Sequence, residues 1–218
     1  LDGIDLAYIH FAVENNYNFE ILEAQTVDYS KNWREKLDAA IDLEDDKLQE
    51  LNKEYTKYLA EVILEFVAEN NIQRLDAVCS HGHTIKHEPQ NGFTLQIGNL
   101  PEISQYLQQR VVCDFRVQDV ALGGQGAPLV PIGDKILFSD YRYCLNLGGF
   151  ANISEKQGDE ILAYDICAVN TVLNHYTRQL GKEYDDKGRI AAGGVLNKEL
   201  LHQLNNLQFY SHKPPKSL

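Results

Sequence analysis

The longest periodic pattern in the chain is a run of apolar residues between Leu43 and Asn70. Its apolar side chains recur at steps of three and four positions: Leu48, Leu51, Tyr55, Tyr58, Leu59, Val62, Ile63, Phe66 and Val67. This spacing places them on one face of a helix. The sequence therefore predicts one long amphipathic helix, whose apolar face has to be covered by another layer of structure.

Shorter apolar runs on both sides of this helix have the character of strands. Residues 4–13 and 19–24 flank a turn-forming segment, which predicts a β-hairpin. Further strands are expected at 75–80, 93–97, 110–115 and 161–164, a Gly-Gly hairpin at 143–154, and helices at 100–109 and 169–180. Because strands and helices alternate and hairpins are mixed in, we expect an α/β fold with a mixed sheet.

The charge balance argues against a nucleic-acid-binding role. The chain has 32 acidic and 20 basic residues, a formal charge of -12, and no Lys/Arg-rich run. Proteins that bind nucleic acid neutralise backbone phosphates with clustered cations. A nucleotide can still bind to backbone N–H groups at Gly-rich turns and to a divalent metal held by carboxylates.

The cysteines and the hydropathy of the chain indicate its compartment. Cys79, Cys113, Cys144 and Cys167 are widely spaced, each in or beside an apolar run, and none forms a CxxC pair. We expect buried free thiols in a reducing cytosol. No apolar stretch has the length of a membrane span, and no signal-peptide pattern appears. The sequence predicts a cytoplasmic protein with neither a membrane nor a nucleic-acid partner.

Three Gly-centred turns accompany the predicted strands. They lie at Gly3, at residues 123–126 and at Gly148-Gly149. A single Gly turn is a weak signal, because glycine serves wherever the backbone needs positive φ or close approach. Asp2 precedes the first turn, however, and a second Gly hairpin follows later. Two such hairpins around the phosphates, with a carboxylate for Mg²⁺, form a plausible nucleotide site.

Polar residues follow the predicted strand 75–80. His81, His83 and His87 are either metal ligands or hydrogen-bonding residues of a strand-to-loop edge. No cysteine or paired carboxylate completes a tetrahedral set at the usual spacing. Thr84, His87 and Gln96 suit hydrogen bonds to sugar hydroxyls equally well.

One acidic residue and one group of charged residues each have both a functional and a structural interpretation. Asp165 follows the expected strand 161–164 and precedes a helix, so it is either a general base for a water or hydroxyl or a helix cap. Asp114, Arg116 and Asp119 lie at the end of another predicted strand and are either site residues or a structural ion pair. The pattern alone leaves both questions open.

Five blocks of the sequence resemble, in order, the anhydro-N-acetylmuramic acid kinase family. They are SHGHTIKHEP at 80–89, TLQIGN at 94–99, DFR with DVA at 114–121, GGQGAPLVP at 123–131 and LNLGGFANI at 145–153. The resemblance spans nearly the whole chain. It implies ribonuclease-H-like domains of the actin, hexokinase and heat-shock ATPase type, with residues 1–155 as the first domain and 156–218 as the start of a second.

The resemblance also implies a reaction. Such a kinase uses ATP and Mg²⁺ to open 1,6-anhydro-N-acetylmuramic acid hydrolytically and to phosphorylate O6, which gives N-acetylmuramic acid 6-phosphate in cell-wall recycling. The implied site residues are Asp165 as the general base, Asp2 and Gly3 as the first phosphate loop with Mg²⁺ on Asp2, Gly148 and Gly149 as the second phosphate loop, and Thr84, His87, Gln96 and Asn170 as sugar-binding residues. A homodimer is a further expectation from the family.

The chain departs from the family pattern in two places. A Met-Ser-Gly-Thr-Ser stretch normally precedes Leu-Asp-Gly and is missing here. The family's Gly-Pro-Gly before Asn170 is replaced by a segment, 166–169, without glycine or proline. These departures leave a second reading, a non-catalytic sugar-binding remnant of the same fold. The missing N-terminal stretch, the absence of methionine and the loop-like residues 214–218 lead us to expect a fragment whose adenosine-binding residues lie beyond Leu218.

Overall fold

The computed structural model describes residues 3–13, 17–158 and 160–216. The chain divides into two compact units, Leu1–Leu129 and Val130–Leu218, which we call unit 1 and unit 2. The strands and helices of each unit follow from its own sequence pattern, and each unit is described by itself.

The expected domain boundary lies after residue 155, whereas the two compact units meet after Leu129. It falls inside strand β8 (Phe150–Gln157), which pairs with β7 (Tyr143–Leu147) on one side and with β9 (Glu160–Ala168) on the other. Because these three strands form one hydrogen-bonded sheet, they group together in unit 2. The compact units therefore do not coincide with the expected domains 1–155 and 156–218.

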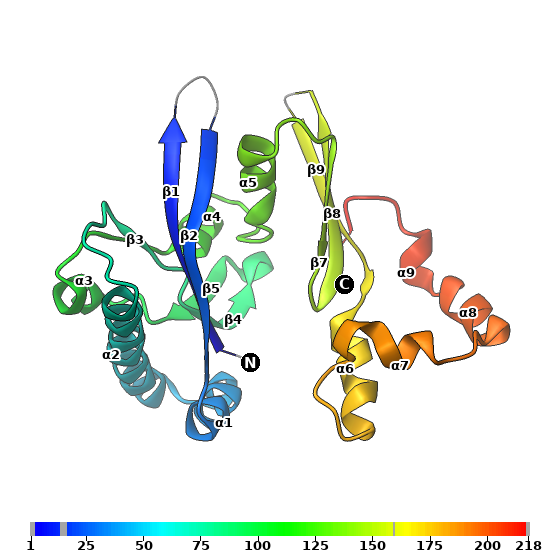
Figure 1. The fold of residues 1–218 in the computed structure, drawn as a ribbon, viewed down its shortest axis with the longest axis horizontal. Helices are drawn as coiled ribbons and strands as arrows, with labels where there is room; N and C mark the ends of the chain where they lie inside the picture. Colours follow the sequence, from blue (N-terminus) through cyan, green and yellow to red (C-terminus); the bar gives the residue numbers. More distant parts are fainter. Residues whose placement is uncertain (1–2, 14–16, 159, 217–218) are drawn as a thin grey trace. The chain divides into compact units, whose positions relative to one another are not determined.

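Unit 1 combines hairpins with helices (Figure 1). In chain order its elements are β1 (Gly3–Val13), β2 (Tyr17–Asp28), α1 (Lys31–Ala39), a 3-10 turn (Ala40–Asp42), α2 (Asp45–Glu69), β3 (Val78–Cys79), β4 (His83–Glu88), a 3-10 turn (Pro89–Asn91), β5 (Phe93–Ile97), α3 (Glu102–Leu107), β6 (Val111–Val112) and α4 (Phe115–Ala121).

The long helix and the first hairpin are confirmed. Helix α2 runs for 25 residues and buries its predicted apolar face, while Asp45 and Asp46 in its first turn complement the helix dipole. The core of unit 1 forms on this face and includes Trp33, Leu37 and Ile97 from other elements. Strands β1 and β2 pair antiparallel along their described length, with one irregularity after Tyr8.

The strands predicted at 75–80 and 110–115 are much shorter in the structure. Only Val78–Cys79 and Val111–Val112 pair, as a parallel ladder. The second prediction was wrong at Phe115, which begins α4. Strand β4 was not predicted, because its polar sequence HTIKHE resembles a loop; it pairs antiparallel with β5. Hydrogen bonds to β5 thus make residues 83–88 a strand, which the hydrophobic pattern of the sequence did not predict.

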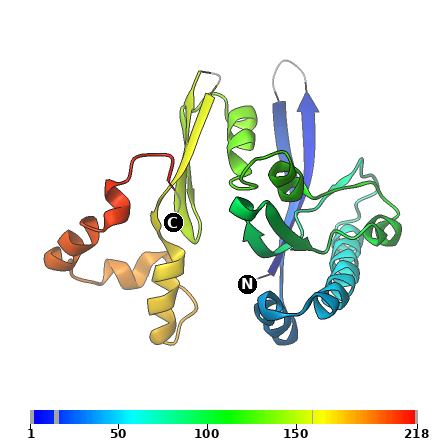
Figure 2. The same cartoon turned by 180° about the vertical axis from the view of Figure 1, so that it is seen from behind.

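Unit 2 is built on the antiparallel β7–β8–β9 sheet and continues into helices (Figure 2). Its other elements are α5 (Val130–Leu137), α6 (Asn170–Gln179), a 3-10 turn (Asp186–Gly188), α7 (Arg189–Ala192), α8 (Lys198–Asn205) and α9 (Gln208–Ser211). The Gly-Gly hairpin predicted at 143–154 is confirmed as β7–β8. Strand β9 extends to Ala168, four residues beyond the predicted end.

These elements confirm the mixed α/β class. In the described part of the chain, the strands form three two-stranded ladders and one three-stranded ladder, and β3–β6 is the parallel pair. The expected single mixed sheet is therefore divided into separate ladders. No helix among the described residues is long and apolar enough to cross a membrane.

The prediction of buried thiols was wrong. Cys79 is exposed, and Cys113, Cys144 and Cys167 are half-buried; all four are free. Cys79 pairs in the two-residue ladder β3–β6, which gives it little cover, although its apolar neighbours in the sequence suggested a longer buried strand.

Helix α2 is joined to the end of β5 at Gly98. The Gly98 N–H donates to Asn52 Oδ1 at 2.8 Å. Gly98 has a φ of +95°, and a Cβ added there would lie 2.8 Å from Cδ1 of the Tyr55 ring. Glycine is required at this position both for its backbone conformation and for the close approach of the helix.

We expect Gly98→Ala to lower the free energy of unfolding by about 2–4 kcal/mol, because backbone strain adds to overlap with Tyr55. Gly92→Ala is the matched control. Gly92 also has a positive φ, +68°, but an added Cβ there meets nothing within 4 Å. Its cost should be only the backbone strain, about 1 kcal/mol. Urea unfolding of both variants measures the difference, and equal losses would contradict the packing argument.

Candidate functional site

The β4–β5 hairpin brings together three of the predicted sugar-binding residues. Thr84 lies opposite Gln96, and His87 lies opposite Thr94, with a register irregularity between these two pairs. Thr94 and Gln96 are two positions apart on β5, so their side chains share one face. We call Thr84, His87, Thr94 and Gln96 the hairpin cluster.

Hydrogen bonds connect the side chains of the hairpin cluster. Gln96 Nε2 donates to Thr94 Oγ1 at 2.9 Å and lies 3.3 Å from Thr84 Oγ1. His87 Nδ1 lies 3.0 Å from Thr94 Oγ1. Gln96 is only 7% exposed, yet its buried Oε1 has no hydrogen-bond partner among the described residues. An unpaired buried acceptor costs about 1–3 kcal/mol, so a donor from a water or a ligand that reached this oxygen would stabilise the cluster.

A glycine in the loop after α4 lies close to His87. The Gly126 N–H donates to Asp119 Oδ2 at 2.7 Å, and the Gly126 carbonyl accepts from Arg116 Nη1 at 2.6 Å. A Cβ added to Gly126 would lie 2.7 Å from Val120 Cγ2 and 3.3 Å from His87 Cε1. The absence of a side chain therefore allows this loop to lie against the hairpin cluster.

Arg116 is half-buried between neutral partners. Its Nε donates to His81 Nε2 at 2.8 Å, so this imidazole nitrogen is unprotonated. Burial lowers the pKa of the Arg116 guanidinium, which still stays charged at neutral pH. Among the described residues, no ion pair involves Arg116, Asp114 or Asp119. The interpretation of these residues as a structural ion pair was therefore wrong. The Arg116 guanidinium supplies positive charge to this region.

The remaining histidine of this segment is part of an aromatic cluster. The His83 ring lies 6.2 Å from the Tyr29 ring and 5.8 Å from the Tyr55 ring, between centroids. Burial lowers the pKa of His83, which favours the neutral imidazole. No group of three His, Cys, Asp or Glu side chains suited to a metal occurs in residues 3–13, 17–158 and 160–216.

The first predicted phosphate loop is only partly described. Asp2, the predicted Mg²⁺ ligand, lies outside the described residues. Gly3 pairs with Asp28 at the start of β1, and a Cβ added to Gly3 would lie 2.4 Å from the Val27 carbonyl oxygen. The close approach of the two strands is enough to require glycine at this position.

The second predicted phosphate loop joins β7 to β8 and contacts α6. The Gly149 carbonyl accepts from the N–H groups of Val169 and Thr171 at 2.9 and 3.1 Å, and the Gly148 carbonyl accepts from Asn170 at 3.3 Å. A Cβ on Gly149 would lie 2.8 Å from Thr171 Oγ1, whereas one on Gly148 would meet nothing nearer than 3.8 Å. The carbonyls of this turn thus accept hydrogen bonds from the N-terminus of α6, and space for an added side-chain atom remains at Gly148.

Asp165 lies within β9 and not at its end, which corrects the predicted position. Val169 occupies the N-cap position of α6, so the helix-cap alternative for Asp165 was wrong. Asp165 pairs with Asn152 of β8, and Asn152 pairs with Asn146 of β7, so these three side chains form a row across one face of the sheet.

The backbone of Asp165 is held on both sides. Asn152 lies opposite Asp165 in the ladder, and the N–H of Asp165 donates to the Lys216 carbonyl at 2.9 Å. In place of the family's glycines and proline, residues 166–168 continue the strand, with one irregularity between Asp165 and Cys167. Strand residues without glycine or proline favour this continuation.

Sequence reasoning missed Thr94 and Asn152. Thr94 is two residues before Gln96 in a predicted strand, and this alternation already placed both side chains on one face. Nothing comparable pointed to Asn152, whose position opposite Asp165 depends on the register of β8 and β9.

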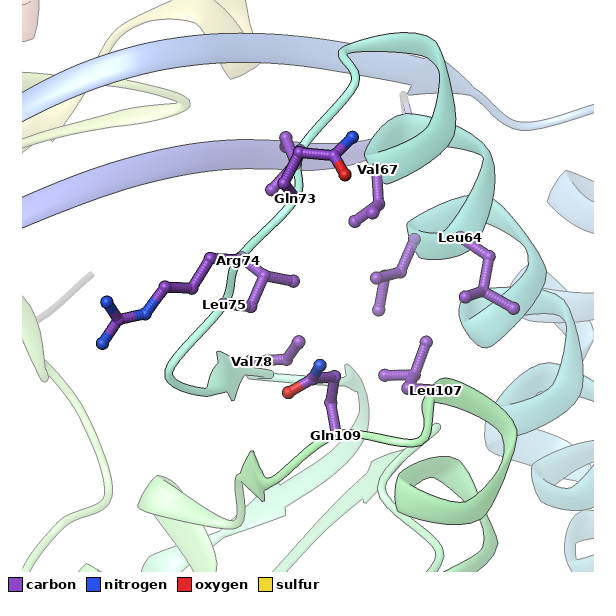
Figure 3. Close-up of a pocket in the computed structure, with 10 residues that line it drawn as sticks. Leu64, Val67, Gln73, Arg74, Leu75, Val78, Leu107 and Gln109 are labelled. Carbon is purple, nitrogen blue, oxygen red and sulfur yellow. The ribbon is translucent and has the colours of Figure 1, made fainter.

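A small cavity of about 90 Å³ lies between α2, residues 72–78 and the end of α3. Leu64, Val67, Leu75, Val78 and Leu107 give it largely apolar walls, and the guanidinium of Arg74 points away from it (Figure 3). None of the predicted site residues lines this cavity, so we do not assign it to the candidate site.

Comparisons with known proteins point to a single family. The family model described as anhydro-N-acetylmuramic acid kinase matches residues 1–218. Proteins of that name are similar to the chain: one from Bacillus cereus is 32% identical over 100% of the chain, one from Acinetobacter baylyi 37% over 81%, and one from Pseudomonas syringae pv. syringae 41% over 66%. The chain spans 62%, 49% and 41% of the length of these relatives, respectively.

Proposed function

The chain belongs to the anhydro-N-acetylmuramic acid kinase family, and on this premise we propose that the complete protein uses ATP to open and phosphorylate 1,6-anhydro-N-acetylmuramic acid. The observation that carries the proposal is the hairpin cluster. It gathers predicted sugar-binding side chains on one face and leaves the buried Gln96 Oε1 without a partner. A sugar hydroxyl or amide N–H would satisfy that acceptor.

Arg116 suits the acidic part of this substrate. A muramic acid carries a carboxylate, which the hydroxyls of the hairpin cluster do not neutralise. The guanidinium of Arg116 has neutral described partners and is linked through Gly126 to the neighbourhood of His87. A guanidinium–carboxylate contact is directional and charge-assisted. We assign Arg116 the role of binding the carboxylate.

Asp165 is proposed as the general base. Its carboxylate takes a proton from the water that attacks the anomeric carbon C1 of the sugar. The new bond forms between C1 and the water oxygen, and the bond between C1 and O6 breaks. O6 then bonds to the γ-phosphorus of ATP, the bond from that phosphorus to the β–γ bridging oxygen breaks, and ADP leaves. The hydrogen-bonded backbone of Asp165 favours a fixed position for its carboxylate. The side-chain amide of Asn152, on the neighbouring strand, is suited to orienting the water.

Gly148 and Gly149 are proposed to contact the phosphates of ATP. Space is open at Gly148, and Asn146 Nδ2, a hydrogen-bond donor, would lie 3.9 Å from a Cβ there. These features fit a phosphoryl oxygen. When bound, ATP supplies the transferable phosphoryl group. We also assign Gly3 to a first phosphate loop, Mg²⁺ to Asp2 and sugar contacts to Asn170, within ribonuclease-H-like domains of the actin and hexokinase type.

The segment 166–169 favours a second candidate, a sugar-binding protein without turnover, because strand replaces the family's Gly-Pro-Gly after the proposed base. The complete protein should be incubated with ATP, Mg²⁺ and the anhydro sugar. We expect ADP release that requires the sugar and a product phosphorylated at O6, detected by ³¹P NMR. Tight binding of the sugar without release of ADP would favour the second candidate. ADP release without sugar would indicate a general ATPase and contradict both.

We expect Asp165→Asn to lower kcat by about 100- to 10,000-fold, because the amide keeps the shape of the carboxylate but does not accept the water's proton. The sugar Kd and the melting temperature should change little. Asp140→Asn is the control, since Asp140 is an exposed acid in the turn before β7. If coupled measurement of ADP release gives Asp165→Asn a turnover close to that of the wild type, Asp165 is not the general base.

We expect Arg116→Gln to weaken binding of the sugar acid by about 10- to 100-fold, which corresponds to the loss of one charge-assisted bond. Binding of 1,6-anhydro-N-acetylglucosamine, which lacks the carboxylate, should change much less. Arg116→Lys keeps the charge and should retain part of the discrimination. Calorimetric titration with both sugars makes the comparison, and equal weakening of the two would show that Arg116 acts only through the loop at Gly126.

A further inference from the structure

We propose that Thr94 is a positioning residue whose hydroxyl orients both Gln96 and His87, so that the hairpin cluster presents an acceptor and a donor to the ligand. The acceptor is Gln96 Oε1 and the donor is the Nε2–H of His87. The inference rests on the proposed sugar-binding role of this cluster. A sugar hydroxyl, which both donates and accepts, is the group that such a pair recognises.

The single hydroxyl proton of Thr94 decides the orientation of the network. Thr94 Oγ1 accepts from Gln96 Nε2 at 2.9 Å and lies 3.0 Å from His87 Nδ1 and 3.4 Å from the Lys86 carbonyl oxygen. The carbonyl is at the outer limit of an O–H···O bond, so the imidazole nitrogen is the better acceptor. We therefore assign the Thr94 proton to His87 Nδ1.

This assignment sets the tautomer of His87. A ring nitrogen that accepts from Thr94 carries no proton, so a neutral His87 has its proton on Nε2. The His87 side chain is exposed, which leaves this donor accessible to a ligand. His87 then acts as a donor toward the sugar, a role that its sequence position alone does not specify.

The same proton sets the orientation of the Gln96 amide. Because the Thr94 proton is engaged with His87, Thr94 is an acceptor toward Gln96. A flipped amide would place Oε1 against an oxygen lone pair of Thr94, so the observed orientation with Nε2 toward Thr94 is favoured. Both hydrogens of Nε2 then have acceptors, at Thr94 and Thr84, and Oε1 remains for the ligand.

The test compares Thr94→Val with Thr94→Ser in the complete protein. Valine keeps the shape of threonine and removes the hydroxyl, whereas serine keeps the hydroxyl. We expect Thr94→Val to raise the KM for the anhydro sugar by about 10- to 100-fold, as for the loss of one or two oriented hydrogen bonds. The kcat and the KM for ATP should change less than about threefold, and Thr94→Ser should restore the KM for the sugar.

Thr177→Val is the matched control, because Thr177 is also a buried threonine, its Oγ1 donates to the Asn174 carbonyl at 3.2 Å, and it is not part of the hairpin cluster. It should leave the KM for the sugar unchanged. Thermal unfolding of all variants establishes that they fold. If Thr94→Val has the wild-type KM, or if Thr94→Ser fails to restore it, the positioning role is wrong.

A spectroscopic measurement separates this inference from the proposed function. In the ligand-free wild type, the ¹⁵N shifts of the His87 ring should report the Nε2–H tautomer, and Thr94→Val should shift the population toward Nδ1–H. An Nδ1–H tautomer in the wild type would overturn the inference even if the protein phosphorylates the sugar. If the wild type neither binds nor phosphorylates the sugar, the proposed function fails, and these shifts still decide whether Thr94 orients His87.

Discussion

The hydrogen bond from the Gly98 N–H to Asn52 Oδ1 joins the main helix of unit 1 to the strand that carries Thr94 and Gln96. Helix α2 supplies much of the core, and Gly98 lies against its Tyr55 ring at the end of β5. The position of β5 relative to the core therefore depends on a backbone contact that only glycine allows. Strand β4 takes its register from β5, so the hairpin cluster depends on the same contact.

The hairpin cluster joins two buried polar side chains, Thr94 and Gln96, to the half-buried Thr84 and the exposed His87. Thr94 and Gln96 are 8% and 7% exposed, and their hydrogen bonds offset most of the cost of burying them. Gln96 Oε1 is the exception among the described residues. These hydrogen bonds hold Thr94, Gln96 and His87 in one arrangement, so a ligand that bound as we propose would find the side chains already ordered.

In unit 2, backbone hydrogen bonds hold the surroundings of Asp165 together. Asp165 pairs with Asn152 within the ladder, and the N–H groups at the start of α6 donate to the carbonyls of the Gly148-Gly149 turn. Residues 166–168 continue β9 in the segment where the resemblance to the family implies glycines and proline. Backbone groups make these contacts, so they do not require particular side chains at residues 166–168.

The sequence by itself determined the long helix, the first hairpin, the Gly-Gly hairpin and the family, because periodicity, turn chemistry and ordered sequence blocks are local properties. It also identified Thr84, His87, Gln96 and Asp165 as candidates. Only the tertiary structure decided that β4 is a strand, that Asp165 lies within β9, and that Arg116 has neutral partners. Strand register and hydrogen-bond partners join residues far apart in the chain, and one proton on Thr94 then sets the direction of bonds that no sequence pattern records.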